Sequence, residues 1–297
     1  MMLVAMAQKI VRLCRTKWIQ VMHREPRWYK VSAGFWMFID PKEWLGRMVL
    51  LGYYEPHLVY FISQVCQEGD VCLDIGAHQG YIALHLARRV GAAGRVLAIE
   101  PVDSNFERLT LNVQRNHAAQ IRCVHCAAGN RTGQIEIWYN PVESGHASAY
   151  YRPCEQANRI QVQVETADEI IERHIESHLL ERISFIKIDV EGFEPLVLQG
   201  LRRTLQRYQP ILWIEKNPPC LQAGGFCVAD IVKPICEHGY QIYEINFHYN
   251  FFGTSDFTLI PSDLESQNFN MKFDDIVAVV PQSKGWERIR CSRIQIR

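Results

Sequence analysis

The fold is constrained most strongly by residues 70–80, which have the sequence DVCLDIGAHQG. A short apolar run, Val71–Ile75, precedes a turn with two glycines, and a helix-like segment follows over residues 81–90. This order is typical of a buried strand, a tight turn and a helix in a parallel α/β sheet. Asp74 stands near the end of the strand, where open parallel sheets bind their ligands.

A second apolar run, residues 94–100 with the sequence GRVLAIE, ends in Glu100. An acid at the end of the second strand can accept hydrogen bonds from both hydroxyls of a ribose. The two acids therefore predict a site for a nucleoside-containing cofactor. The alternative is an α/β domain whose first turn is acidic without binding a ligand.

The glycine spacing distinguishes between cofactors. Dinucleotide-binding turns carry Gly-x-Gly-x-x-Gly, which lets a pyrophosphate approach the start of the helix. Here Asp74 takes the place of the first glycine, Gln79 takes that of the third, and Gly80 comes one residue late. A carboxylate at position 74 repels a pyrophosphate but suits a cationic group, such as the amine of a methionine moiety. We therefore expect S-adenosylmethionine rather than NAD.

Charged residues interrupt another predicted strand, residues 183–190. Lys187 and Asp189 share one face of it, although central strands of parallel sheets are buried on both faces. Opposite charges buried there must pair, and perturbed charges at a strand end are candidates for function. We expect Asp189 and Glu191 to flank the place where cofactor and acceptor meet, with Glu215 facing it from the next strand. A structural pair of Lys187 with a carboxylate is the alternative.

Several segments together resemble the FkbM family of S-adenosylmethionine-dependent methyltransferases, and the resemblance extends over residues 50–245. The segments are residues 52–56, 74–80, 100–101, 105, 186–194 and 210–215. The sequence departs from the family at His78, where relatives often carry Asn. The resemblance implies a doubly wound, seven-stranded, mostly parallel α/β sheet of the Rossmann-like class I methyltransferase type. It also implies methyl transfer to a hydroxyl of a sugar, glycolipid or natural product.

The cofactor is expected along the ends of the first three strands. Asn105 lies in the first turn of the helix after Glu100, where its amide reaches the ribose or only caps the helix. Small, flexible residues at positions 127–129 suit the edge of an adenine. The candidate cofactor-binding residues are Asp74, Gly76, Ala77, His78, Gly80, Glu100, Pro101, Asn105 and Ala127.

A hydroxyl acceptor must lose its proton during methyl transfer, so a positioned base would assist the reaction. The candidate catalytic residues are Asp189, then Glu191, then His146 in the loop of residues 140–159. His146 is alternatively a solvated surface residue. Asp189, Glu191 and Glu215 could instead hold a divalent ion that orients a diol, but no metal ligand is assigned.

The chain is expected to divide into an N-terminal segment (1–55), a methyltransferase domain (56–285) and a basic, flexible tail (286–297). Residues 1–24 have apolar positions at helical spacing and predict an amphipathic helix. This helix lies on a membrane surface, acts as a lid or dimer contact, or packs on the core. The aromatic residues 28–54 predict short strands that either wall the acceptor pocket or only pack on the core.

Composition narrows the partners. The formal net charge is zero, so no global field favours nucleic acid, and a small-molecule or glycan acceptor is expected. Ten cysteines without a regular framework, and no secretory signal, predict a reduced, cytoplasmic protein. Nothing in the sequence predicts an oligomeric state. A non-catalytic scaffold that retains the fold and an NAD-dependent oxidoreductase are the competing functions.

Overall fold

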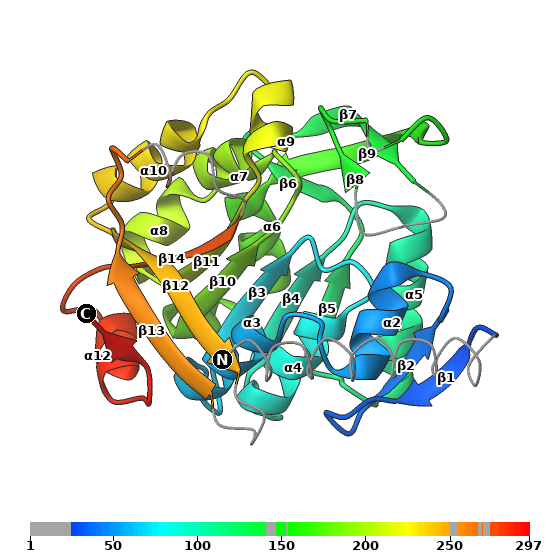
Figure 1. Cartoon of the computed structure of the whole chain (residues 1–297), viewed down its shortest axis with the longest axis horizontal. Coiled ribbons are helices and arrows are strands. Elements are labelled where there is room, and N and C mark those ends of the chain that lie inside the picture. The colour runs from blue at the N-terminus through cyan, green and yellow to red at the C-terminus, as the bar shows by residue number, and fades with distance from the viewer. Residues whose placement is uncertain (1–24, 141–146, 153, 250–254, 267–268, 270–273) are drawn as a thin grey trace, which may run out of the picture.

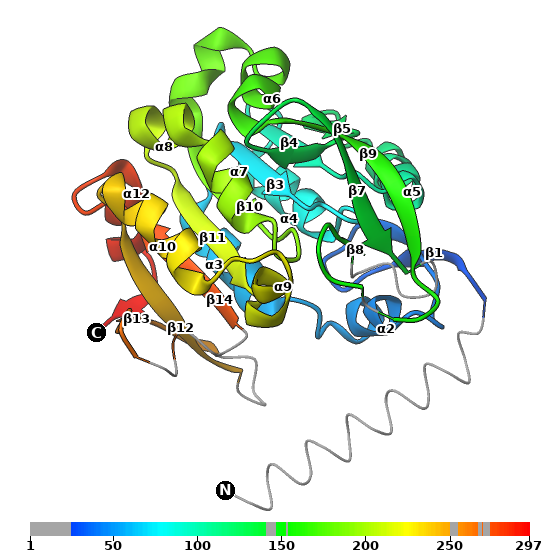
Figure 2. The ribbon, with the colours of Figure 1, turned by 90° about the horizontal axis from the view of Figure 1, so that it is seen from above.

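The computed structural model describes residues 25–140, 147–152, 154–249, 255–266, 269 and 274–297. Its centre is a nine-stranded sheet with helices on both faces (Figures 1 and 2). The strands follow the order β15-β13-β12-β14-β11-β10-β3-β4-β5. Their bounds are β3 Val71–Ile75, β4 Arg95–Ile99, β5 Ile121–Val124, β10 Ile183–Ile188, β11 Ile211–Lys216, β12 Gln241–Tyr249, β13 Ser255–Pro261, β14 Asp274–Val279 and β15 Gln295–Ile296.

The strands from β5 to β11 are parallel, whereas β14 runs antiparallel to both of its neighbours, β11 and β12. The seven strands from β5 to β12 therefore form the doubly wound, mostly parallel sheet that the sequence predicts. β13 and β15 extend this sheet at its far edge. The chain leaves β3 toward β4 on one side and returns to β10 on the other, which makes the β3–β10 boundary the topological switch point.

Two apolar cores cover the two faces of the sheet. One core includes residues of α3 (Pro56–Val65), α4 (Tyr81–Val90), α5 (Asp103–Arg115) and α12 (Lys284–Arg290). The other includes residues of α6 (Ala167–His174), α7 (Glu194–Gly200), α8 (Arg202–Tyr208) and α10 (Val228–Glu237). The central strands are apolar because both of their faces are buried in this way.

A four-stranded sheet stands beside the carboxyl ends of the parallel strands, at the upper right of Figure 1. Its order is β6 (Ala127–Gly129), β9 (Asn158–Thr166), β7 (Gly133–Tyr139) and β8 (Ala147–Ser148). The third strand, which the sequence predicts over residues 121–127, therefore ends at Val124, and the small residues Ala127–Gly129 belong to this second sheet. Part of the predicted acceptor loop, residues 141–146, lies outside the described residues.

The N-terminal aromatic segment forms a hairpin and a helix. β1 (Arg27–Lys30) and β2 (Trp36–Ile39) pair with each other. Asn112 of α5 and its C-cap residue Asn116 accept hydrogen bonds from the β2 backbone at 2.8 and 2.7 Å. The expectation of strands throughout is wrong for α2 (Trp44–Leu51), which is helical and ends at Gly52. Leu45, Met48 and Val49 are buried at helical spacing, and tertiary packing thus outweighs strand propensity.

The C-terminal region is more regular than the sequence indicated. The polar residues 247–273, whose composition predicts an irregular linker, contain β13, in which Phe257 and Leu259 are buried two positions apart. The prediction of a flexible tail over residues 286–297 is also wrong, because residues 284–290 form α12. The guanidinium of Arg288 makes two hydrogen bonds to the carboxylate of buried Asp70, which supplies the physical reason for the order.

Within the described ranges, no helix is both long and apolar enough to cross a membrane. The predicted amphipathic helix, residues 1–24, lies outside those ranges.

Candidate active site

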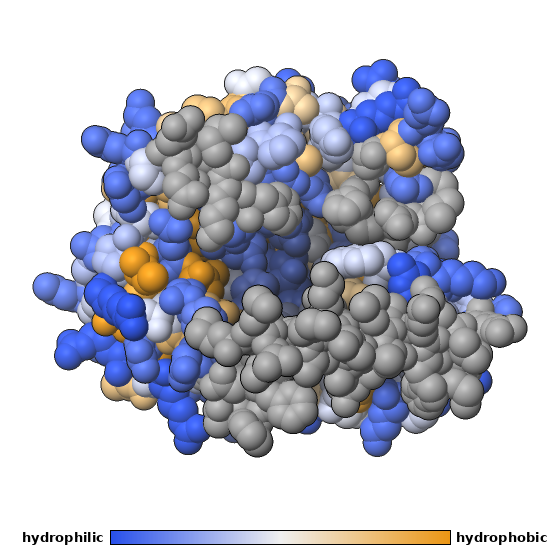
Figure 3. Space-filling view, viewed as in Figure 1, coloured by the Kyte–Doolittle hydropathy of each residue, from blue (hydrophilic) through white to orange (hydrophobic). Residues whose placement is uncertain are grey.

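A crevice opens where β3 and β10 end, at the switch point of the sheet. Figure 3 shows this side of the molecule hollowed near its centre, with hydrophilic surface inside the hollow. The polar side chains that line the crevice are those of Tyr54, His78, Glu100, Asn105, Asp189 and Glu191. Apolar walls come from Ile99, Ala127, Ala128 and Phe193, among others. The lining of the crevice thus combines acidic and apolar side chains.

Gly76, in the turn after β3, lies directly against the turn after β10. It has φ +83°, and a Cβ on it would lie 1.8 Å from the carbonyl oxygen of Asp189. Its amide and that of Ala77 both donate to the carbonyl of Ile99, at 3.0 and 2.9 Å. The turn is therefore fixed against β4, and these two N–H groups are already used within the protein.

Glu100 occupies the position that the sequence predicts for a ribose ligand. Its carboxylate accepts from the amides of His78 (2.8 Å) and Val102 (3.0 Å) and from the Asn105 side chain (3.4 Å). Burial raises the pKa of Glu100 to about 7, and the backbone donors at Val102 and His78 act in the opposite direction. A carboxylate has about four acceptor positions, so capacity remains for a ligand hydroxyl in the crevice.

Asp74 lies beneath the crevice and is not among the residues that line it. It is fully buried, and neither of its oxygens has a hydrogen-bond partner among the described residues. The nearest cation is Lys187, whose Nζ lies 3.6 Å from Oδ1. Burial raises the pKa of Asp74 to about 6, while Lys187 lowers it. The structure thus shows Asp74 facing Lys187.

Lys187 holds the two central turns together. Its Nζ lies 3.0 Å from Oδ2 of Asp189 and donates to the carbonyl of Gly76 at 3.3 Å. Burial opposes the charge, but Asp189 and Asp74 together raise the pKa of Lys187 above its usual value. The ammonium is therefore a permanent charge that fixes Asp189 at the edge of the crevice.

Asp189 and Glu191 differ in exposure and in partners. The side chain of Asp189 is 28% exposed and lines the crevice. Burial acts to raise its pKa, but Lys187 and other partners together lower the pKa by more, so the net shift is downward. Glu191 has a left-handed backbone (φ 51°), and its Oε2 accepts from Asn217 at 2.8 Å. The Ser148 hydroxyl donates to the Glu191 carbonyl at 2.6 Å. Glu191 is consequently held in place by two other segments.

The last acid of the Lys-x-Asp-x-Glu-Gly-x-Glu segment has a structural role. Glu194 is fully buried and accepts from the amides of Val190 (3.1 Å) and Gly192 (3.0 and 3.2 Å). Gly192 has φ +96°, and a Cβ there would lie 2.7 Å from the carbonyl of Cys220. This half of the segment shapes the turn that presents Asp189 and Glu191.

The remaining predicted residues are distributed as follows. Pro101, Asn105 and Ala127 line the crevice, whereas Ala77 does not, and Gly80 is the N-cap of α4. His146 lies outside the described residues. Tyr54, from the aromatic segment 28–54, lines the crevice. Ser148, Asn217 and the role of Glu194 were not predicted from the sequence. Of these three, only Glu194 carried a local signal, an acid shortly after a glycine at the start of a helix.

A doubly wound sheet with a crevice at its switch point, and with Glu100 at the end of the second strand, defines a Rossmann-like methyltransferase fold. The Methyltransferase FkbM domain matches residues 74–270, and the chain belongs to this family.

The relatives are distant. Methyltransferase 1 of Beauveria bassiana is 22% identical over 146 residues, which cover 43% of this chain and 57% of the relative. The hexuronic acid methyltransferase AglP of Haloferax volcanii is 25% identical over 152 residues, covering 51% and 58%. The matched part of the chain spans less than three fifths of these relatives. A crystal structure of a methyltransferase FkbM from Methylobacillus flagellatus has 19% identity and a TM-score of 0.43, covering 79% of this chain and 52% of that one.

Proposed function

We propose that this chain transfers a methyl group from S-adenosylmethionine to a hydroxyl oxygen of a small-molecule or glycan acceptor. The observation that carries the cofactor class is the use of the amides in the first turn. Gly76 and Ala77 donate to Ile99, and His78 donates to Glu100. A pyrophosphate requires free amides at such a turn, so the geometry disfavours NAD.

The residues of the crevice fit the parts of S-adenosylmethionine. Glu100 and Asn105 offer acceptor and donor groups to a ribose, and the wall of Ala127, Ala128 and Phe193 offers an apolar face to an adenine. Asp189, held ionised by Lys187, lines the same crevice, at the place where the methyl group of the cofactor would meet the acceptor. Bound there, the cofactor supplies a methyl group already activated by its sulfonium.

Because the methyl group is already activated, the protein contributes mainly alignment and removal of water. Asp189 is the carboxylate that both lines the crevice and is partly exposed, so it accepts the hydrogen of the attacking hydroxyl and takes its proton. Its lowered pKa keeps the carboxylate ionised at neutral pH, so it can accept the proton as the new bond forms. Glu191 is the second candidate base.

The acceptor class is supported by two observations. One relative carries the name hexuronic acid methyltransferase, which indicates a sugar-type acceptor within the family. Leu45 and Tyr54 reach the crevice from the N-terminal segment, which supports an acceptor wall at residues 25–55. The formal net charge of zero argues against nucleic acid.

The test is incubation of the purified chain with trideuteromethyl-labelled cofactor and a panel of sugars, glycans and hydroxylated natural products, read by mass spectrometry. The expected product is an acceptor heavier by one labelled methyl group. Asp189→Asn should lower the rate at least about 100-fold. The exposed Asp256→Asn should leave it unchanged. Binding of the cofactor without transfer to any hydroxyl would contradict the proposed acceptor class.

A further inference from the structure

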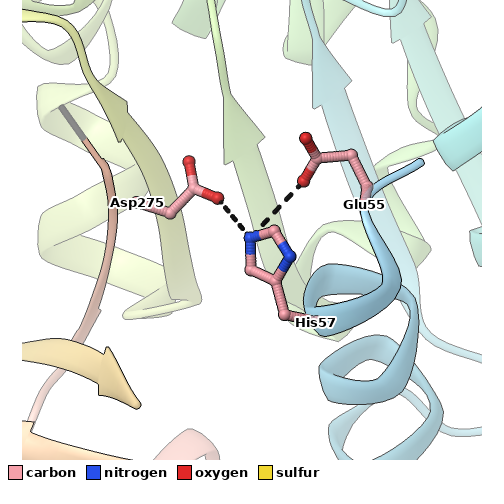
Figure 4. A group of neighbouring side chains, drawn as sticks. All are labelled: Glu55, His57 and Asp275. Atoms are coloured by element: carbon pink, nitrogen blue, oxygen red, sulfur yellow. Dashed lines mark hydrogen bonds and ion pairs between the residues drawn. The ribbon is translucent and has the colours of Figure 1, made fainter. Parts of the chain in front are cut away.

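A histidine and two carboxylates converge beside the crevice from two elements that are far apart in the sequence. Glu55 is the N-cap of α3, His57 lies in its first turn, and Asp275 lies on β14. Figure 4 shows both carboxylates pointing toward the same ring nitrogen of His57. Nε2 lies 2.8 Å from Oδ2 of Asp275 and 3.6 Å from Oε2 of Glu55. One ligand-type atom from each residue lies within 4.8 Å of the other two.

Glu215, which has an oxygen within 4.8 Å of oxygens of Asp189 and Glu191, also borders the group of Glu55, His57 and Asp275 through the strand register. In the ladder between β11 and β14, Glu215 lies opposite Asp275, and Lys216 lies opposite Asp274. Lys216 and Asp274 form an ion pair with an N–O distance of 2.8 Å, whereas Glu215 and Asp275 place two carboxylates side by side. Like charges directly opposite each other destabilise a sheet unless a cation lies between them. Oε2 of Glu215 is buried and has no hydrogen-bond partner in the described part of the chain.

The nearby protein cations do not balance these acids. Lys187 already lies between Asp74 and Asp189. His57 faces Glu55 and Asp275 and supplies at most one positive charge. Three carboxyl groups therefore lie around one imidazole, and a bound cation would offset the repulsion among them.

We propose that Glu55, His57 and Asp275, together with Glu215, bind a divalent transition-metal cation. One imidazole combined with carboxylates suits Mn²⁺ or Zn²⁺ better than Ca²⁺ or Mg²⁺, which prefer oxygen ligands alone. Metal–ligand bonds of about 2.0–2.2 Å bring neighbouring ligand atoms to about 3 Å from one another, which the two distances at Nε2 bracket. The ion replaces the proton on Nε2.

From Asp189, which follows β10, Glu215 lies one strand away on β11 and Asp275 two strands away on β14. An ion there would hold oxygen atoms of the acceptor; this part of the inference depends on the proposed function, whereas metal binding itself does not.

The test uses the untagged full chain after treatment with a chelator. Titration with Mn²⁺ is followed by the electron paramagnetic resonance signal of the free ion, and Zn²⁺ binding is followed by calorimetry. We expect about one ion per chain. Asp275→Asn and Glu55→Gln should each weaken binding at least about tenfold. Asp256→Asn, an exposed control, should not change it.

Two results would overturn the inference. One is no binding of either ion to the unmodified chain. The other is binding that Asp189→Asn abolishes while Asp275→Asn and Glu55→Gln leave it intact, because the ion would then belong to the carboxylates of Asp189, Glu191 and Glu215. Thermal unfolding checks that every variant is folded. If Asp275→Asn does not fold, the Glu55→Gln variant alone tests the site. Titration of the metal-free chain with S-adenosylhomocysteine tests the proposed function separately.

Discussion

The ammonium of Lys187 lies 3.0 Å from the carboxylate of Asp189, although Lys187 belongs to a strand that is buried on both faces. The same ammonium donates to the carbonyl of Gly76. One buried cation therefore connects the turn after β3 with the turn after β10. Because the crevice opens between these turns, its geometry depends on this charge.

Replacing Lys187 by Met should destabilise the fold by about 3–5 kcal/mol, because Asp74 and Asp189 would be left without a counter-charge. Chemical denaturation measures the change. Arg207→Met, which removes an exposed partner of Glu181, is the matched control and should hardly move the unfolding midpoint. Equal effects of the two substitutions would show that Lys187 has no special role.

Gly76→Ala tests the close approach of the two turns. The new Cβ would meet the Asp189 carbonyl at 1.8 Å, so we expect loss of cofactor binding and a lower melting temperature. Gly225→Ala is the control, because Gly225 also has a positive φ (+76°) but no atom within 4 Å of the new Cβ. If both variants bind S-adenosylhomocysteine like the unmodified chain, contact between the turns is not required.

Glu194 should make stability depend on pH. Burial raises its pKa from 4.5 to about 8, although the backbone donors around it favour the charged form. A carboxyl with a raised pKa stabilises the native state below pH 4.5, and the contribution is lost as pH rises toward 8. The slope in this window is about 1.4 kcal/mol per pH unit.

Glu194→Gln removes this titration while keeping one oxygen to accept from Val190 and Gly192. We therefore expect its melting temperature, relative to that of the unmodified chain, to rise steadily between pH 5 and 8. Parallel curves for the two proteins would mean that Glu194 is ionised in the native state throughout.

The C-terminal segment should contribute to stability. Arg288→Met would leave buried Asp70 without its guanidinium, at an expected cost of about 2–3 kcal/mol in the free energy of unfolding. Arg290→Met, on the exposed side of the same helix, should have little effect. No difference between the two variants would show that α12 is not anchored through Asp70.

Features set by local sequence were predictable. The strands ending at Ile75, Ile99 and Ile188 are apolar runs bounded by turn residues, and Glu100 follows from its place at a strand end. The charges at Lys187 and Asp189 were recognisable because they interrupt such a run. The seven-stranded part of the sheet could therefore be predicted.

Features set by register and by distant contacts were not predictable. Asp74 faces Lys187 because the two are paired across β3 and β10, and the sequence does not state that register. His57 and Asp275 meet across 218 positions, through the antiparallel return of β14. The β13 strand was missed because its two buried apolar residues, Phe257 and Leu259, stand among polar residues.

The cofactor class is best tested by calorimetric titration with S-adenosylhomocysteine and with NAD. We expect binding of S-adenosylhomocysteine alone, with a dissociation constant on the order of micromolar. Glu100→Gln should weaken it by about tenfold or more. Glu107→Gln, an exposed acid on the neighbouring helix, should leave it unchanged. Binding of NAD without S-adenosylhomocysteine, or of neither, would contradict the account.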